Sequence, residues 1–261
     1  MRTILLDIGG TFIKRADGGA IPSASAGSRE EIAAALKAAV GDTAGVQGIG
    51  VAIPGPFDFA QGVFRMEHKF AAAYGCSFRE LAGIPAGIPL RFGHDVAITL
   101  KGAIQEMELR DTAALVTLGT GLGFAHAVDG QVQYGPTGSP ARGIWNLPWE
   151  DGILEDRVSA RGIRGTYARL GGNDKASVLD IARKAYSGDA TAYEAFHTTG
   201  RILGEALAPV VSELHISTLL FAGQISRSLL LLKDGLRACL GSLRITQAPE
   251  DAVYKGLASL F

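Results

Sequence analysis

The sequence has few cysteines, almost no net charge and no long hydrophobic run, and each of these scarcities excludes a class of protein. Its 261 residues include only two cysteines, Cys76 and Cys239, which lie far apart and outside any CxxC or Cys/His cluster. A structural zinc site is therefore not expected, and a reducing compartment suits the chain. The formal net charge of −1 argues against a dedicated nucleic-acid binder, which usually carries a basic face.

No apolar run approaches the ~18 residues that a membrane-spanning helix needs. The apolar start of the chain ends at Asp7, which is too early for a secretory signal. We therefore expect a cytoplasmic protein with neither a membrane nor a nucleic-acid partner. The hydrophobic content of 47% is ample for a folded core, in one large domain or in two lobes.

Two glycine-rich segments carry most of the functional information. Asp7-Ile8-Gly9-Gly10-Thr11 follows the apolar residues 3–6, and Leu118-Gly119-Thr120-Gly121-Leu122-Gly123 follows the apolar residues 113–117. Each pattern predicts a strand, a glycine turn and a second strand. Such a turn exposes backbone N–H groups beside a threonine hydroxyl, which favours phosphate oxygens. Two copies predict a duplicated scaffold that holds one polyphosphate, and hence a nucleotide-dependent phosphotransferase.

Other readings of the glycine segments fit less well. A dinucleotide-binding fingerprint needs GxGxxG between a strand and a helix. The segment 119–123 has a different spacing, and the residues after it alternate as in a strand. A GxxxxGK[ST] phosphate loop does not occur. A glycine hairpin without a ligand would explain either segment alone, but not their pairing.

Two further positions attract attention. Pro54-Gly55-Pro56 ends the expected strand 46–53 and predicts a stiff loop at a strand end, where ligands often bind in α/β sheets. Asp95 lies between a short strand at 90–92 and a helix at 96–107, near the positive end of the helix dipole. On position alone Asp95 is either a catalytic carboxylate or a helix N-cap.

The remaining pattern completes an α/β chain. We expect helices at 28–40, 78–81, 153–169, 176–186, 190–214, 226–240 and 249–261, and strands at 3–8, 12–15, 113–118, 122–128 and 216–222. Residues 1–107 would form an N-terminal lobe and residues 108–249 a C-terminal lobe, with the last helix, within 250–261, packing back on the first lobe.

In this order, the motifs Asp7–Lys14 (DIGGTFIK), residues 51–58 (VAIPGPFD), His94-Asp95 and residues 118–123 (LGTGLG) resemble the ROK sugar kinases (repressor, open reading frame, kinase). The resemblance implies the duplicated, ribonuclease-H-like fold of actin, hexokinase and Hsp70, with two lobes and a ligand cleft between them. It also implies an ATP-dependent transfer of phosphate to a sugar hydroxyl, and dimers, which are common in the family.

The resemblance assigns roles to individual residues. Asp7 would hold Mg²⁺ and Asp95 would accept the proton of the attacking hydroxyl. The expected nucleotide contacts, most of them in glycine turns, are Gly9, Gly10, Thr11, Lys14, Gly119, Thr120, Gly121, Gly223 and Gln224. The expected sugar contacts are Pro54, Gly55, His68, His94 and Glu155.

The chain also departs from the family pattern. The Glu-x-Gly-His stretch that usually follows the second glycine turn is replaced by residues 138–142 (GSPAR), and no zinc-binding cysteines follow. His94 stands where the family usually has asparagine. Glucose is therefore not expected by default, and Lys69 or Arg142 would suit an acceptor that carries a carboxylate or phosphate. Inorganic polyphosphate remains an alternative donor to ATP.

Two rival functions follow from the same patterns. A type III pantothenate kinase has a similar size and fold, but its glycine motifs differ from those of this chain. A sugar-sensing ROK repressor would carry a helix-turn-helix before the first glycine turn, where only six residues precede Asp7. An inactive sugar binder would be expected to lack Asp95 or the glycine turns, so the kinase is favoured.

Overall fold

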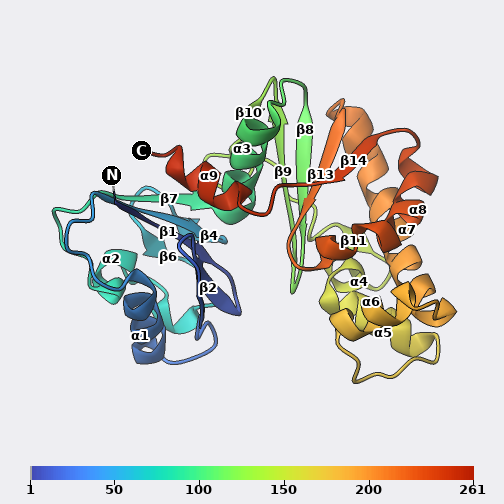
Figure 1. The fold of residues 1–261 in the computed structure, drawn as a ribbon, viewed down its shortest axis with the longest axis horizontal. Helices are drawn as coiled ribbons and strands as arrows, with labels where there is room; N and C mark the ends of the chain where they lie inside the picture. The colour runs from blue at the N-terminus through green and yellow to red at the C-terminus, as the bar shows by residue number, and fades with distance from the viewer. Residues whose placement is uncertain (1) are drawn as a thin grey trace. The chain divides into compact units, whose positions relative to one another are not determined.

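The computed structural model describes residues 2–261, which divide into two compact α/β units (Figure 1). The first unit comprises the chain up to Leu109, together with Val132–Ala141 and Glu250–Phe261. The second comprises Arg110–Gln131 and Arg142–Pro249. The C-terminal helix therefore belongs to the first unit, and so does the segment 132–141.

The first unit contains a five-stranded sheet in the order β3-β2-β1-β4-β7. The central strands β1 (Thr3–Ile8), β4 (Gly48–Ile53) and β7 (Leu90–His94) are parallel, and every residue of β4 is buried. The strands β2 (Phe12–Arg15) and β3 (Ala20–Pro22) continue the sheet as an antiparallel meander. The uninterrupted apolar run of β4 is typical of a strand covered on both faces.

The second unit repeats this arrangement in the order β10-β9-β8-β13-β14. Here β8 (Ala113–Leu118), β13 (Thr218–Ala222) and β14 (Arg244–Gln247) are parallel, and β9 (Leu122–Val128) returns antiparallel to β8. β10 (Gln131–Val132) follows β9. Each sheet thus contains a strand–glycine turn–strand hairpin whose first strand is followed across the sheet by two further parallel strands. The predicted duplication is confirmed.

Helices cover the first sheet. α1 (Arg29–Val40) starts at Ser28 with the predicted capping box, and α2 (Phe78–Ala82) is a short helix. α3 (Asp95–Met107) packs on α9 (Ala252–Ala258) so closely that a Cβ on Gly102 would lie 1.8 Å from the Ala252 carbonyl oxygen. Glycine is required there because the two helix backbones touch.

The second unit holds the helices α4 (Leu154–Val158), α5 (Ala160–Arg169), α6 (Val178–Tyr186), α7 (Ala190–Glu213) and α8 (Leu229–Leu240). The single helix expected at 153–169 is broken at Ser159, which has an extended backbone. The helix expected at 226–240 starts later, because residues 225–228 form a 3₁₀ turn (η2, Ile225–Ser228). α7 continues through Pro209.

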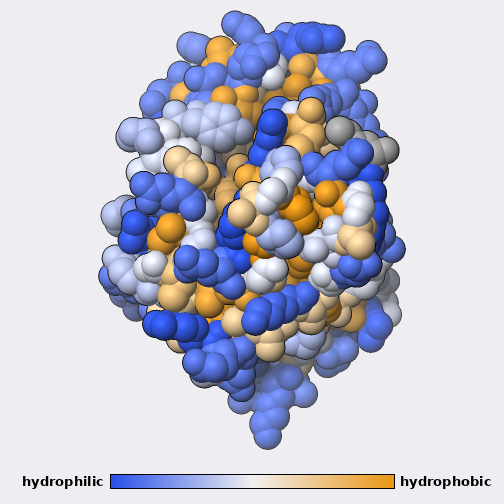
Figure 2. Space-filling model, turned by 90° about the vertical axis from the view of Figure 1, so that its left-hand side faces the viewer, coloured by the Kyte–Doolittle hydropathy of each residue, from blue (hydrophilic) through white to orange (hydrophobic). Residues whose placement is uncertain are grey.

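Short elements fill the connections: β5 (Phe57–Asp58), β6 (Val63–Phe64), η1 (Ala71–Ala73), β11 (Pro148–Trp149) and β12 (Gly152–Ile153). Within the first unit, the aromatic rings of residues 57, 64, 70, 78 and 92 pack in one cluster, with edge-to-face, tilted and stacked pairs. The face of the molecule drawn in Figure 2 is largely hydrophilic, with apolar side chains gathered near its middle. No helix within residues 2–261 is long and apolar enough to cross a membrane.

Candidate functional site

The carboxyl ends of the three parallel strands in the first unit bring together the predicted polar residues. Asp7 of β1 pairs in register with Ala52 of β4, and Ile53 of β4 pairs with His94 of β7. One edge of the sheet therefore carries Asp7, the Pro54-Gly55-Pro56 loop and His94-Asp95. In open α/β sheets this edge is the usual place for ligands.

The first glycine turn connects β1 to β2 beside this edge. The Gly9 N–H donates to the Phe12 carbonyl over 2.9 Å, which closes the turn, and Thr11 is exposed. Lys14 lies opposite Asp7 across the hairpin, with its Nζ 4.0 Å from Asp7 Oδ2. The turn thus presents a hydroxyl and a cation beside a carboxylate.

The surroundings of Asp7 disfavour the ionised form of its carboxyl group. Its pKa is raised from the ordinary value of 3.8 to about 6, chiefly by burial and secondly by the negative charge of Asp95, while the positive charge of Lys14 opposes both. Its side chain is 25% exposed, so one side remains open to solvent. A carboxylate in this condition gains from any cation that binds to it.

Asp95 is the first residue of α3, whose N-cap is His94, so it is not the N-cap considered from sequence alone. Burial would raise the pKa of Asp95, but the charge and contact of His94, the Val96 N–H and the charge of Lys69 outweigh it and lower the pKa. The Val96 N–H lies 2.8 Å from Asp95 Oδ1. Asp95 is therefore ionised at neutral pH.

His94 holds Asp95 in place. Its Nδ1 is buried and lies 2.9 Å from Asp95 Oδ1, which is ion-pair distance, although the contact is not aligned as a regular hydrogen bond. The ring also packs against Phe59, with 6.0 Å between ring centroids. His94 thus links the strand end to the carboxylate that follows it.

Gly55 is the residue of the proline loop that lies beside His94 and Ser139. A Cβ on Gly55 would lie 3.6 Å from His94 Nε2 and 3.5 Å from Ser139 Oγ. Ser139 belongs to the segment that replaces the family's Glu-x-Gly-His stretch, and we did not single it out from the sequence. Spacing alone carries no signal for this contact, because the two positions are 84 apart in the sequence. His68, another predicted sugar contact, is exposed.

The second glycine turn joins β8 to β9 in the second unit. Thr120 is exposed, and Gly119 has an ordinary backbone with nothing within 4 Å of a built Cβ. Neither strain nor packing therefore requires glycine at position 119. The backbone at this position is open to the approach of another group.

Glu155 supports this second turn. Its Oε2 accepts the Leu122 N–H over 2.9 Å, and its Oε1 lies 3.1 Å from Arg161 Nη2. A Cβ on Gly121 would lie 2.9 Å from Glu155 Oε2. Arg161 is a member of this group that sequence reasoning missed.

Gly223 ends β13 at the same sheet edge as the second turn, since Thr117 of β8 pairs with Ala222. Its φ of +90° and a distance of 2.4 Å from a built Cβ to the Leu118 carbonyl oxygen both require glycine. Gln224 is exposed beside it. The structure therefore places both glycine turns of this unit, 119–121 and 223–224, at one sheet edge.

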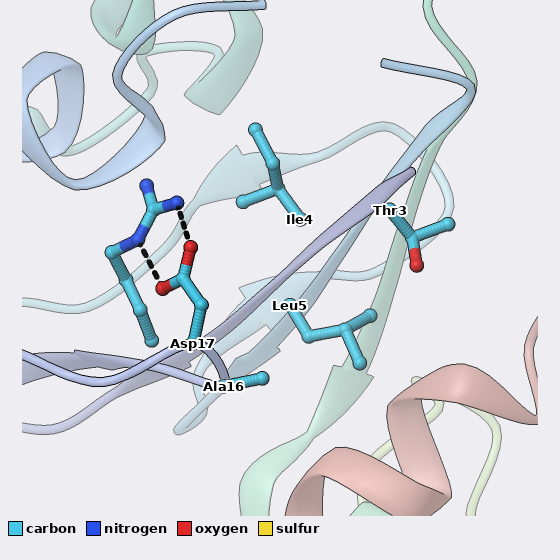
Figure 3. A pocket seen from close by; sticks show the side chains of 6 residues that line it. Thr3, Ile4, Leu5, Ala16 and Asp17 are labelled. Atoms are coloured by element: carbon cyan, nitrogen blue, oxygen red, sulfur yellow. Dashed lines mark hydrogen bonds and ion pairs between the residues drawn. The ribbon is translucent and has the colours of Figure 1, made fainter. Parts of the chain in front are cut away.

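Two further places in the molecule, the side chain of Arg142 and a cavity beside β1, carry charged groups that are already paired with other side chains. Arg142 pairs with Glu213, with 2.7 Å between Nη1 and Oε2, so its charge is compensated. A cavity of about 240 Å³ lies at the opposite end of β1, lined by Thr3, Ile4, Leu5, Arg15, Ala16 and Asp17 (Figure 3). Arg15 and Asp17 form a two-pronged ion pair at 2.7 and 2.6 Å there, which leaves no free charge for a ligand.

Asp7 offers the site a carboxylate oxygen as a metal ligand. Among residues 2–261, no group of three or more histidines, cysteines and acids is arranged to hold a metal ion. Cys76 and Cys239 are free thiols. Asp7 can contribute a single carboxylate to Mg²⁺, which commonly takes one or two protein carboxylates and fills its shell with water and substrate phosphates.

Comparisons with known proteins identify the family and the fold. The model of the ROK family matches residues 24–259. A ROK family glucokinase from Streptomyces griseus, solved with glucose and AMPPNP, is similar at a TM-score of 0.81 and 21% identity, over 99% of this chain and 98% of that one. A ROK hexokinase from Thermus thermophilus is similar at 0.72 and 21%, over 99% and 97%.

A ROK family transcriptional regulator, a homologue of the E. coli MLC protein, is similar at a TM-score of 0.73 and 18% identity. The match covers 99% of this chain but 80% of the regulator. No curated protein matches the sequence. The solved structures establish the fold, which is the duplicated fold expected from the motifs.

Proposed function

The chain belongs to the ROK family, and on this premise we propose that it is an ATP-dependent kinase that transfers the terminal phosphoryl group to a hydroxyl of a sugar or sugar-like molecule. One observation carries the proposal: an ionised Asp95 and a partly buried Asp7 lie at the same edge of one sheet, at the ends of β7 and β1 on either side of β4, beside an open glycine turn. A mere sugar binder has no need of two such carboxylates. The S. griseus relative, solved with glucose and AMPPNP, supports the choice of substrates.

The nucleotide is assigned to the glycine turns. Backbone N–H groups and threonine hydroxyls suit phosphate oxygens, and the bare Gly119 leaves room for them. Gly223 and Gln224 would lie against the adenosine. The phosphate contacts are then Gly9, Gly10, Thr11, Lys14, Gly119, Thr120 and Gly121.

Asp7 is assigned to Mg²⁺. Its raised pKa reflects burial and the nearby charge of Asp95, and a bound cation would relieve both costs. When bound, Mg²⁺ would neutralise the developing charge on the phosphate oxygens. Lys14, 4.0 Å from Asp7, contributes a second positive charge on the same hairpin.

Asp95 is assigned to the acceptor hydroxyl. The hydroxyl oxygen forms a bond to the terminal phosphorus, and the bond from that phosphorus to the bridging oxygen breaks, with its electron pair leaving on ADP. The hydroxyl proton passes to the Asp95 carboxylate. Its lowered pKa keeps Asp95 ionised and ready to orient the hydroxyl, and His94 fixes its position.

The acceptor is assigned to the loop beside Asp95. Pro54 and Gly55 would supply backbone, and His68 and His94 would supply ring nitrogens to its hydroxyls. Glu155 retains lone pairs for a sugar hydroxyl while its carboxylate binds Leu122 and Arg161. Ser139 is added to this set because it lies beside Gly55 and His94.

The test is a screen for ADP release with Mg·ATP over neutral hexoses, amino sugars and sugar acids. We expect sugar-dependent release with at least one class. A ROK family transcriptional regulator is among the similar structures, so a sugar sensor is the rival function. Tight sugar binding without ADP release from any member of the panel would favour a sensor over a kinase.

A further inference from the structure

Lys69 is a charged side chain beside the first glycine turn to which the proposed function gives no task. It lies in the segment between β6 and η1, and its side chain crosses Gly10. A Cβ built on Gly10 would lie 3.4 Å from Lys69 Cδ and Cε and 3.8 Å from Nζ. The ammonium group is therefore held over the exposed backbone of the turn.

The chain around Lys69 is fixed to that turn. The Phe70 N–H donates to the Ser25 carbonyl over 2.6 Å, and the Ser25 hydroxyl donates to the Gly10 carbonyl over 2.5 Å. Phe70 is fully buried and has a left-handed backbone, with φ of 53°. A bulky residue keeps this conformation only where its surroundings impose it. Lys69 is thus presented by a rigid support.

The charge of Lys69 is not neutralised by an ion pair. Among residues 2–261, no carboxylate lies at ion-pair distance from its ammonium group, whereas Lys14 has Asp7 as a partner. Its charge still reaches Asp95, whose pKa it helps to lower. An uncompensated cation thus lies over the phosphate turn, and its charge acts on the carboxylate expected to receive the proton.

We propose that Lys69 is a further catalytic residue, whose ammonium group contacts the phosphoryl group as it moves from the nucleotide to the acceptor. This inference rests on the function proposed above. Phosphoryl transfer gains most from positive charge on the equatorial oxygens, which a fixed ammonium group supplies. Lys69 remains protonated throughout, so the balance of bonds and protons is unchanged.

The experiment compares Lys69→Met with Lys69→Arg and a matched control, Lys37→Met. Methionine keeps the apolar stem over Gly10 and removes the charge. Lys37 is a fair control because its stem also covers a glycine of the same unit, with Cε 3.5 Å from a Cβ built on Gly83, far along the chain from the two turns. We expect Lys69→Met to lower kcat about 100-fold or more and to leave the KM for the sugar within about twofold.

We further expect Lys69→Arg to recover part of the rate and Lys37→Met to behave as wild type. A second readout does not need turnover: in calorimetry with inorganic tripolyphosphate, Lys69→Met should bind about tenfold more weakly than wild type. If the wild type phosphorylates no acceptor, the proposed function fails, and this binding comparison still decides whether Lys69 contacts phosphate.

Two results would overturn the inference while leaving the kinase intact. In the first, Lys69→Met has the turnover and the tripolyphosphate affinity of wild type, so that Lys69 merely covers Gly10. In the second, Lys69→Met keeps its rate with neutral sugars but loses activity with sugar acids, which would assign the ammonium group to the acceptor.

Discussion

Replacing Asp7 with asparagine should make the protein more stable in the absence of nucleotide and metal. The pKa of Asp7 rises from 3.8 to about 6 in the folded state, chiefly through burial and secondly through the charge of Asp95. Each pH unit of that difference corresponds to about 1.4 kcal/mol, so the ionised carboxylate costs the folded protein about 3 kcal/mol above pH 6. This figure is an upper value, because 25% of the side chain is exposed.

The sign of the pH dependence follows from the raised pKa. Asp7 stabilises the fold most below pH ~4, where it is protonated in both states, and this contribution is lost as the pH rises through about 6. The advantage of Asp7→Asn, measured by urea unfolding, should therefore be near zero at pH 4 and reach up to about 3 kcal/mol at pH 7.

Asp17→Asn is the control for this experiment. Its hydrogen bond to Arg15 lowers the pKa of Asp17, so its replacement should not stabilise the protein at neutral pH. If Asp7→Asn were destabilising at pH 7, or if its effect did not change between pH 4 and pH 7, the electrostatic argument for Asp7 would be refuted.

Three substitutions in the second unit should separate structural from functional roles. Gly223→Ala should destabilise the protein by about 1–3 kcal/mol in urea unfolding, because of its positive φ and the close Leu118 carbonyl. Gly119→Ala should leave stability within about 0.5 kcal/mol but weaken ATP binding in calorimetry; unchanged affinity would count against its phosphate role. Glu155→Ala should cost about 1–3 kcal/mol by leaving the Leu122 N–H unpaired, and an unaffected midpoint would contradict this.

The parts of the fold that could be predicted from sequence are those with a local signal. The apolar run of β4 predicts a buried strand, and the capping box at Ser28 predicts the start of α1. The strand β14 was not predicted, because Ile245 is the one apolar residue among its four and the strand begins soon after α8 ends at Leu240. The break at Ser159 was missed, since the helical periodicity runs through it.

The candidate site divides in the same way. Asp7 and Asp95 could be found because each interrupts the apolar pattern near the end of a strand, Asp7 within β1 and Asp95 directly after β7. The contact of Ser139 with Gly55 and the placement of Lys69 over Gly10 depend on long-range packing, which no spacing in the sequence records. From the sequence alone, Lys69 was indicated only as a cation that could bind an acceptor carrying a carboxylate or phosphate.

The central claim is that Asp95 receives the proton of a sugar hydroxyl during phosphoryl transfer. The most direct test measures sugar phosphate by mass spectrometry for the wild type and Asp95→Asn, with sugar affinity from calorimetry. We expect similar affinities and a product rate that is ~10²–10⁴-fold lower in the variant. Product formation by Asp95→Asn at the wild-type rate, with the same sugar, would contradict the account.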